Sequence, residues 1–158
     1  TAAESSAGAS WFQNTAPTSS VISVGTVSDV NASGNDFIAY CWAPVDGFSA
    51  FGKYTGNGSA DGPFVYPGFR PKVILFKDIT NTQNWGILDT ERDPINVAGH
   101  WLTPNSNVVE YDFTGVYPHD ILSNGFKLRN SYGAANANGD TYIWACWAEH
   151  PFKTARAR

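Results

Sequence analysis

The chain has 158 residues, of which 15% are charged and 15% aromatic, and its formal net charge is −4. Charged residues make up about 25% of an ordinary domain, so neutral polar residues carry much of this surface, as in turn-rich β proteins found outside the cell or in virus particles. The acidic balance argues against nucleic acid as a partner, and no apolar stretch reaches the roughly 20 residues that span a membrane.

The first part of the chain alternates between turn residues and short apolar runs. An Ala- and Ser-rich leader, residues 1–19, is expected to pack against this chain or a neighbour through Trp11 and Phe12, because it cannot fold alone. The alternating run at 20–27 predicts a strand. After an Asn- and Gly-rich turn, residues 36–45 carry large side chains on both faces, which indicates a central strand.

The second part contains the clearest strand signals. Residues 47–64 begin as a strand and become a Gly-rich loop, while residues 70–79 and 85–94 are typical of a hairpin. Further strands are predicted at residues 97–104, 108–115, 121–130 (with a bulge at Asn124-Gly125) and 140–151. About nine or ten strands, separated by turns every 8 to 12 residues, predict an all-β, antiparallel β-sandwich or jelly-roll-like fold.

One short pattern occurs twice in the sequence. Residues 31–43 (NASGNDFIAYCWA) and 136–148 (NANGDTYIWACWA) align without a gap at an offset of 105. A repeat of this kind indicates a duplicated structural unit more often than a duplicated active site. Cys41 and Cys146 are therefore expected at matched buried positions, as free thiols in preference to a disulfide.

This internal duplicated strand unit also suggests a division of the chain. Residues 1–48 are interpreted as the C-terminal part of a first β-unit whose start is missing. Residues 49–158 are interpreted as a complete second β-unit, packed with the first as one domain. Five side chains are expected near the core: Phe37, Trp42, Tyr142, Ile143 and Trp147.

Residues that often carry catalysis are present but poorly placed for it. Asp89, Glu91 and Asp93 cluster with Arg92 in one turn, whereas glycan hydrolysis needs two carboxylates facing each other across a cleft. A solvated hairpin end is the preferred interpretation. The histidines, His100, His119 and His150, lack the spacing of a zinc site. We predict no catalytic residue, no metal ligand and no cofactor.

The Gly-rich loop KYTGNGSADGPF offers a weak candidate for ligand binding. Tyr54, Asn57 and Asp61 could bind a sugar, which pairs an aromatic platform with amide and carboxylate hydrogen bonds. The preferred alternative is that the glycines shape a tight connection between sheets. If a host ligand is bound, the turns at 78–84 (DITNTQN) and 102–111 (LTPNSNVVEY) are equally good candidates.

Four segments are long enough to compare with known families: FIAYCWAPVDGFSAFGKYTGNGSADGPFVYPGFRPKVILFKDI, NWGILDTERDP, ILSNGFKLR and GDTYIWACWAEHPFKTARAR. Together they resemble a family of tail-associated proteins of phages and prophages, over nearly the whole chain. In that family the unit often ends a longer virion protein, after concanavalin-like or other β modules. The chain departs from it modestly, because Trp42 and Trp147 stand where Phe is common. The resemblance implies no catalytic residues.

The resemblance implies a structural or host-recognition role in a virus particle. We expect a non-enzymatic tail fibre or spike adhesin module that contacts a host-surface polysaccharide. The alternatives are a capsid or tail decoration protein without host contact, and a fragment of a glycan-depolymerising tailspike. The weakly charged, aromatic-rich surface favours a homo-oligomer, a trimer first, which would also contact other virion proteins.

Overall fold

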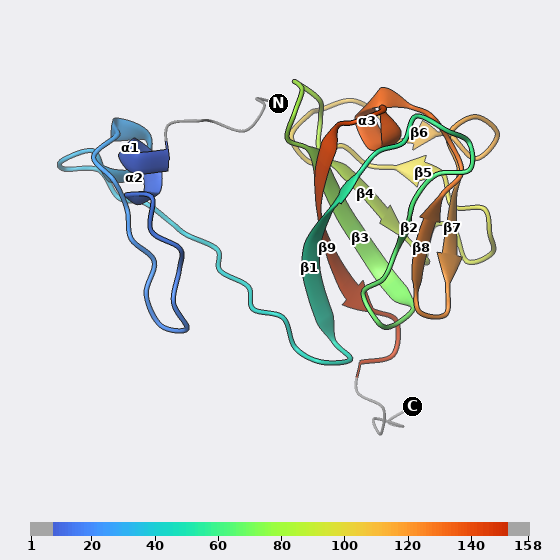
Figure 1. Cartoon of the computed structure of the whole chain (residues 1–158), viewed down its shortest axis with the longest axis horizontal. Helices are drawn as coiled ribbons and strands as arrows, with labels where there is room; N and C mark the ends of the chain where they lie inside the picture. Colours follow the sequence, from blue (N-terminus) through green and yellow to red (C-terminus); the bar gives the residue numbers. More distant parts are fainter. Residues whose placement is uncertain (1–7, 152–158) are drawn as a thin grey trace. The chain divides into compact units, whose positions relative to one another are not determined.

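The computed structural model describes residues 8–151, which form two compact units, residues 8–42 and 43–151 (Figure 1). The smaller unit contains two short helices, α1 (Gly8–Phe12) and α2 (Ser28–Asn31), joined by loops. The Gly25 amide donates to the Trp11 carbonyl at 2.6 Å and so ties the loop before α2 to α1. The larger unit contains the strands. No helix in residues 8–151 is long and apolar enough to cross a membrane.

The larger unit is built from three antiparallel sheets and one short helix, α3 (Gly133–Asn136). Its strands are β1 (Ser49–Thr55), β2 (Phe64–Val65), β3 (Pro71–Asp78), β4 (Gly86–Asp89), β5 (His100–Trp101), β6 (Tyr111–Asp112), β7 (His119–Leu122), β8 (Gly125–Leu128) and β9 (Thr141–Ala148). The sheet orders are β1-β9-β3-β4, β2-β8-β7 and β5-β6, as Figure 1 shows. The predicted all-β class is confirmed, and its finer description as a sandwich or jelly roll stays a prediction.

Strand β9 is the centre of the largest sheet. It pairs with β1 from Thr141 to Trp147 and with β3 along its other edge. Its side chains alternate, and Tyr142, Cys146 and Ala148 are buried, because successive residues of a strand point to opposite faces. Burial raises the pKa of the Cys146 thiol far above its ordinary value.

One core joins the two larger sheets. Ile74, Phe76 and Leu88 from β3 and β4 belong to the same buried cluster as Phe126 and Leu128 from β8. Each of these side chains is at most 2% exposed. Burying a side chain of this size contributes about 1.5–3 kcal/mol, so this cluster fixes the positions of the loops at the sheet ends.

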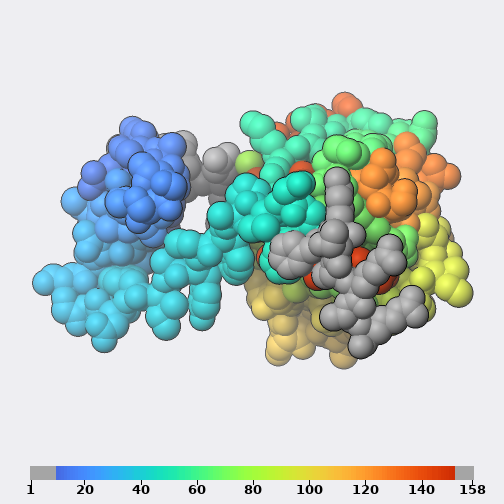
Figure 2. Space-filling view, turned by 90° about the horizontal axis from the view of Figure 1, so that it is seen from below, coloured from blue at the N-terminus to red at the C-terminus, as the bar shows by residue number. Residues whose placement is uncertain are grey.

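Three predictions for the first part of the chain are wrong. Residues 20–27 and 36–44 contain no strand, and Cys41 is exposed, whereas Cys146 is buried. Phe37 and Trp42, expected near the core, are 48% and 62% exposed. Figure 2 shows this segment, in light blue to cyan, with its side chains at the surface. A central strand needs a neighbour on each edge. Within the described residues β9 has β1 and β3 as neighbours, whereas residues 36–44 pair with no strand.

Two smaller expectations also need correction. Residues 121–130 do not form one bulged strand, because Ser123 and Asn124 make the turn of a hairpin between β7 and β8. In the leader, Trp11 is half-buried but Phe12 is 50% exposed, so within this chain only Trp11 packs, and packing of Phe12 against a neighbouring chain stays a prediction. Residues 1–7 of the leader lie outside the described residues. Of the other expected core residues, Tyr142 is buried, while Ile143 and Trp147 are half-buried.

The two cysteines should differ in their reactivity. In the folded 158-residue chain, a thiol reagent is expected to modify Cys41 quickly and Cys146 only after unfolding, because the first is exposed and the second is 0% exposed. Mass spectrometry of the alkylated native protein should show one adduct per chain, on Cys41, and two in denaturant. Rapid labelling of Cys146 in the native state would contradict this packing.

Candidate functional site

A small pocket lies at the end of the larger unit where β5 and β6 meet α3. It is lined by three turn residues before β4 and by an aromatic group: Gln83, Asn84, Trp85, Trp101, Thr103, Tyr111, Phe113, Tyr132 and Ala134. Its volume is about 140 Å³. Drug-sized ligand sites occupy about 300–1,000 Å³, so this pocket suits one small ring or a group projecting from a larger molecule.

The rim of the pocket is held by asparagine side chains. The Trp85 amide donates to Asn105 Oδ1 at 2.9 Å, and Asn105 Nδ2 donates to Asn84 Oδ1 at 2.9 Å. These two bonds join the turn before β4 to the turn after β5, twenty residues further along the chain. Asn84 therefore presents its Nδ2 donor from a fixed position, because its oxygen is already held.

The wall of the pocket is aromatic. Tyr111 stacks on Phe113 with ring centroids 5.0 Å apart, and the Trp101 ring meets Phe113 edge-on at 5.3 Å. Tyr132 completes the wall and stacks on Tyr117 at 4.0 Å. Aromatic pairs of this kind are worth about 0.5–1.5 kcal/mol beyond the area they bury. The wall is therefore rigid before any ligand arrives.

Two polar atoms at the pocket have no hydrogen-bond partner. They are Trp101 Nε1 and Thr103 Oγ1, both buried, and Trp101 as a whole is 3% exposed. A buried donor without a partner costs about 1–3 kcal/mol. Such atoms are uncommon in native proteins and need an explanation, and both belong to residues that line the pocket.

His119 lies behind the aromatic wall. Its ring centroid is 5.5 Å from that of Trp101 and 6.0 Å from that of Phe76. Desolvation lowers the pKa of His119 to about 4, although a hydrogen bond to the Tyr117 backbone raises it in part. The imidazole is therefore neutral at pH 7, and the histidine acts as a packing residue of the wall.

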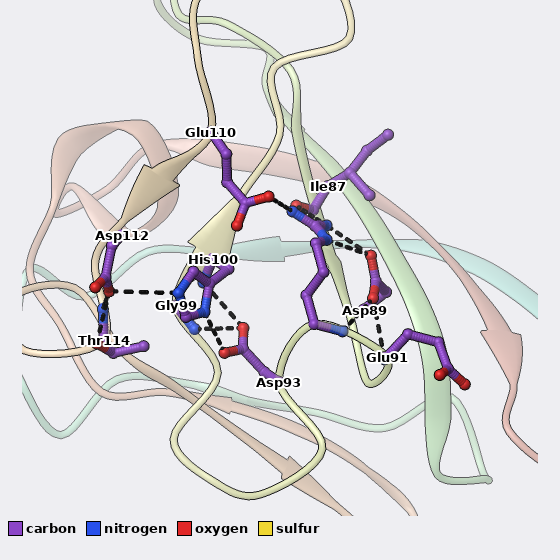
Figure 3. A network of polar contacts seen from close by, with 10 residues as sticks. Ile87, Asp89, Glu91, Asp93, Gly99, His100, Glu110, Asp112 and Thr114 are labelled. Atoms are coloured by element: carbon purple, nitrogen blue, oxygen red, sulfur yellow. Dashed lines mark hydrogen bonds and ion pairs between the residues drawn. The ribbon is translucent and has the colours of Figure 1, made fainter.

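The predicted carboxylate cluster forms a polar network around β5 (Figure 3). Asp93 accepts hydrogen bonds from the Gly99 and His100 amides at 2.9 Å and lies 2.6 Å from His100 Nδ1. This bond to Asp93 raises the pKa of His100. Asp93 is only 6% exposed, so it is not the solvated turn residue that the sequence pattern predicts.

The other half of the network is organised by Arg92. Its guanidinium lies 2.6 Å from the Asp89 carboxylate and 3.5 Å from that of Glu110. Asp89 also accepts the Glu91 and Arg92 amides and so caps the turn after β4. These contacts fix the loop between β4 and β5. The carboxylates of Asp89 and Asp93 accept hydrogen bonds from backbone amides of the loop. The network is therefore suited to a structural role.

The three sugar-binding candidates of the Gly-rich loop are engaged in internal contacts. The Tyr54 hydroxyl donates to the Ala135 carbonyl at 2.8 Å, and the ring stacks on Tyr142. Asn57 donates to the Asp61 carbonyl, and the exposed Asp61 carboxylate pairs with Lys127 at 2.8 Å. A binding role for these three residues stays a prediction.

Two glycines of this loop lie so close to neighbouring backbone that no side chain fits there. A Cβ on Gly56 would lie 2.1 Å from the Ala137 carbonyl oxygen, and one on Gly62 would lie 2.7 Å from that of Leu128. Real Cβ atoms do not approach so closely, which agrees with a structural interpretation of the loop. The loop crosses between elements with no room for side chains at these positions.

Metal binding finds no support in the described part of the chain. Within residues 8–151, no group of three or more His, Cys, Asp or Glu side chains is arranged to hold a metal ion. His100 contacts Asp93, His119 is buried among rings, and His150 is exposed.

Comparison with known proteins assigns the chain to a family. A family model described as "Domain of unknown function (DUF7483)" matches residues 1–151. The chain belongs to the DUF7483 family. Over 41 residues it is also 50% identical to a protein of Clostridium pasteurianum described as "34.2 kDa protein in rubredoxin operon". That segment is 25% of this DUF7483 chain and 13% of the relative's length. No solved structure matches the chain significantly.

In this DUF7483 chain, the turns of the pocket were predicted separately from the sequence, but their proximity was not. The turns at 78–84 and 102–111 were both candidates for ligand contact, and the structure brings them together through Asn105. Trp101 was missed because it lies in a segment predicted as a strand, residues 97–104, and Tyr132 because it lies in the small-residue stretch between two predicted strands. The available signal was a Trp beside each turn, in QNWG and HWLTPN. No Asp, Glu or His is among the described residues that line the pocket.

Proposed function

We propose that this chain is a non-enzymatic module of a virus particle that binds a glycan of the host surface, as part of a tail fibre or spike. The observation that carries this proposal is the pocket between β4, β5 and α3. Its aromatic wall suits the apolar face of a sugar ring. The Asn84 side chain, whose oxygen is held by Asn105, leaves its Nδ2 donor for a hydroxyl, and the residues that carry the unpartnered Trp101 Nε1 and Thr103 Oγ1 line the same pocket.

The setting of this function is proposed from the resemblance to tail-associated proteins of phages. In that setting the chain assembles as a homo-oligomer, for which a trimer is the preferred state, and it contacts other virion proteins of the tail. Exposed apolar residues on the larger unit, among them Ile95 and Val109, support contacts with further chains. A single small pocket binds weakly, at about millimolar Kd, and several copies on one particle make attachment firm.

The test is a binding titration on the 158-residue chain. Fragments of bacterial surface polysaccharides and their component monosaccharides are added to isotope-labelled protein, and amide NMR shifts are followed. We expect saturable shifts at residues 83–85, 101–103 and 132–134. Trp85→Ala should weaken binding about tenfold, which corresponds to about 1.4 kcal/mol. The Trp85 backbone amide, and its bond to Asn105, remain in this variant.

Tyr66→Ala is the matched control, because Tyr66 is an aromatic residue that is 65% exposed and does not line the pocket. It should bind as the parent chain does. Shifts elsewhere, or no binding by any sugar, would refute the pocket as the site and favour a decoration protein without host contact. Shortening of a polysaccharide during incubation would instead favour the depolymerase alternative.

A further inference from the structure

The two copies of the repeated sequence share more than residue types. Helix α2 at Ser28–Asn31 and helix α3 at Gly133–Asn136 are each four residues long and lie 105 residues apart, the offset of the repeat. In both copies the residue before the helix is extended, with φ of −67° and ψ of 137° at Val27 and 130° at Tyr132. Residues 27–31 of the smaller unit therefore have the same local backbone conformation as residues 132–136 of the larger unit.

The same hydrogen bonds recur at matched positions. Asn31 Nδ2 donates to the Gly25 carbonyl at 2.9 Å, and Asn136 Nδ2 donates to the Asn130 carbonyl at 2.6 Å. Both donor and acceptor are displaced by 105 residues. After each helix a glycine adopts positive φ, 80° at Gly34 and 85° at Gly139. A side chain disfavours this conformation, so each copy ends in the same turn.

The copies differ at the next step. After Gly139 the chain enters β9, which pairs along both edges with β1 and β3. After Gly34 the chain forms no strand through residue 44. Its apolar side chains stay at the surface, with Ile38 81% and Tyr40 76% exposed. Large apolar side chains this exposed at alternate positions of one segment are unusual in a folded chain and mark a contact surface.

We infer that residues 36–43 are the central strand of a second sheet of this kind, whose flanking strands are supplied by polypeptide preceding residue 1. The register follows from β9. Phe37, Cys41 and Ala43 correspond to the buried residues Tyr142, Cys146 and Ala148, and they face the core of that second unit. Cys41 then lies opposite the counterparts of Ala50 and Ile74.

A second copy of this chain is the less suitable partner. Its central position is filled by its own β9, which is paired with β1 over residues 141–147 and with β3 over nearly the same length. A unit that lacks only this strand is required. The first copy matches the second from residue 25, through the helix and turn, to the end of the strand. The elements without a counterpart are the flanking strands β1 and β3, which precede this segment in the larger unit. This inference is independent of glycan binding.

One position predicts a feature of the partner unit. Ala39 corresponds to Trp144, whose ring leaves no room for a side chain at Gly52, since a Cβ there would lie 2.7 Å from the indole. Because Ala39 has no ring, the position that corresponds to Gly52 in the second unit has room for a side chain. The counterpart of Gly52 in the second unit is therefore expected to be a larger residue, which fills the volume left by the missing indole.

The register is tested by grafting the first copy onto the second. Replacing residues 136–148 with the sequence of 31–43 changes six positions: Asn138→Ser, Asp140→Asn, Thr141→Asp, Tyr142→Phe, Trp144→Ala and Ala145→Tyr. A second graft omits Trp144→Ala, so that the cavity left by the indole does not decide the result. The control graft carries residues 35–42 at positions 141–148, one residue out of register, which reverses the two faces of the strand and leaves Asn136 and Gly139 in place.

Urea denaturation followed by circular dichroism reports the outcome. The graft that retains Trp144 should unfold cooperatively, with Cys146 protected from thiol reagent as in the parent chain. The shifted graft should lose cooperative unfolding, and its thiol, which then stands at position 147, should react with the reagent in the native state. Equal behaviour of the two grafts, folded or unfolded, would overturn the assignment of residues 36–43 as a strand of this register.

The partner is tested with the natural gene product at full length. Its Cys41 should react with thiol reagent at least tenfold more slowly than Cys41 of the 158-residue chain, because the second sheet covers it. Equal reactivity in the two proteins would overturn the proposal. Protection of Cys41 in the 158-residue chain that grows with protein concentration would also overturn it, by showing that a second copy covers the segment.

Discussion

The Asn136→Ala variant is expected to lose roughly 3–5 kcal/mol of stability, because its side chain fills a buried junction of three chain segments. Asn136 is 0% exposed. Its Nδ2 lies 2.6–3.0 Å from the Asn130 and Ser59 carbonyls and from Asn57 Oδ1, and its Oδ1 accepts the Asn57 amide at 2.8 Å. Removing the amide leaves several of these groups buried without partners, each at a cost of about 1–3 kcal/mol.

Urea denaturation of the variant and the parent chain measures this loss. Asn138→Ala is the matched control, because Asn138 is two residues away on the same turn and is exposed. It should change the free energy of unfolding by less than about 0.5 kcal/mol. A loss below about 1 kcal/mol in Asn136→Ala would show that water replaces the amide, and that the junction does not depend on this side chain.

Asn136 also shows where sequence reasoning reached its limit. The repeat NASGN and NANGD correctly identified a turn used twice, since Asn, Gly and the helix before them recur with the same local bonds. Such bonds span only six residues, and a local pattern can encode them. The contacts of Asn136 with Asn57 and Ser59 span nearly eighty residues, and nothing in the local pattern distinguishes this asparagine from Asn31.

The same apolar pattern predicted strands correctly in the second part of the chain and incorrectly in the first part. Residues 70–79 and 140–151 were predicted as strands and contain β3 and β9, which pair with each other. Residues 36–45 have the same apolar pattern and form no strand, because hydrogen bonding in a sheet depends on neighbours that the pattern does not contain. The pattern shows that a segment can be a central strand, and the rest of the chain decides whether it is one.

The candidate site was predictable in its parts. Turns with amides and a Trp can be recognised locally, and the turns at 78–84 and 102–111 were both recognised. That they form one pocket depends on Asn105, which bonds across to Asn84 and Trp85. The burial of Asp93 was missed for the same reason, since its partners Gly99 and His100 lie across a loop. Side-chain bonds between loops are the least visible feature of a sequence.

The second large effect is a loss of stability in acid that is caused by His119. Desolvation lowers the pKa of His119 from 6.5 to about 4 in the folded chain. Between these values the unfolded state binds a proton that the folded state does not, so stability falls as the pH falls through this window. The difference between 6.5 and about 4 corresponds to about 3 kcal/mol, which is present above pH 6.5 and lost by about pH 4.

Few other groups act in the same window. The bond from Asp93 raises the pKa of His100, so His100 adds stability as the pH falls toward 6, with the opposite sign to His119. It is about a third exposed, and solvent screening keeps its effect small. Carboxyls such as Asp61, whose pKa is lowered by the hydrogen bond from Lys127, also lose stability as the pH falls, but only below about pH 5, where the unfolded state begins to bind their protons. The slope between pH 5 and 6.5 therefore reports mainly on His119.

His119→Phe should remove most of this slope, because phenylalanine keeps an aromatic ring beside Trp101 and Phe76 but carries no titrating group. The free energy of unfolding in urea, measured at pH 7 and at pH 5, should fall steeply in the parent chain and much less in the variant. His100→Gln is the matched control and should keep the steep slope. An NMR titration of the imidazole gives the independent measurement. A His119 that protonates near pH 6.5 without unfolding, or equal slopes in His119→Phe and the parent chain, would show that water reaches the ring behind the pocket wall.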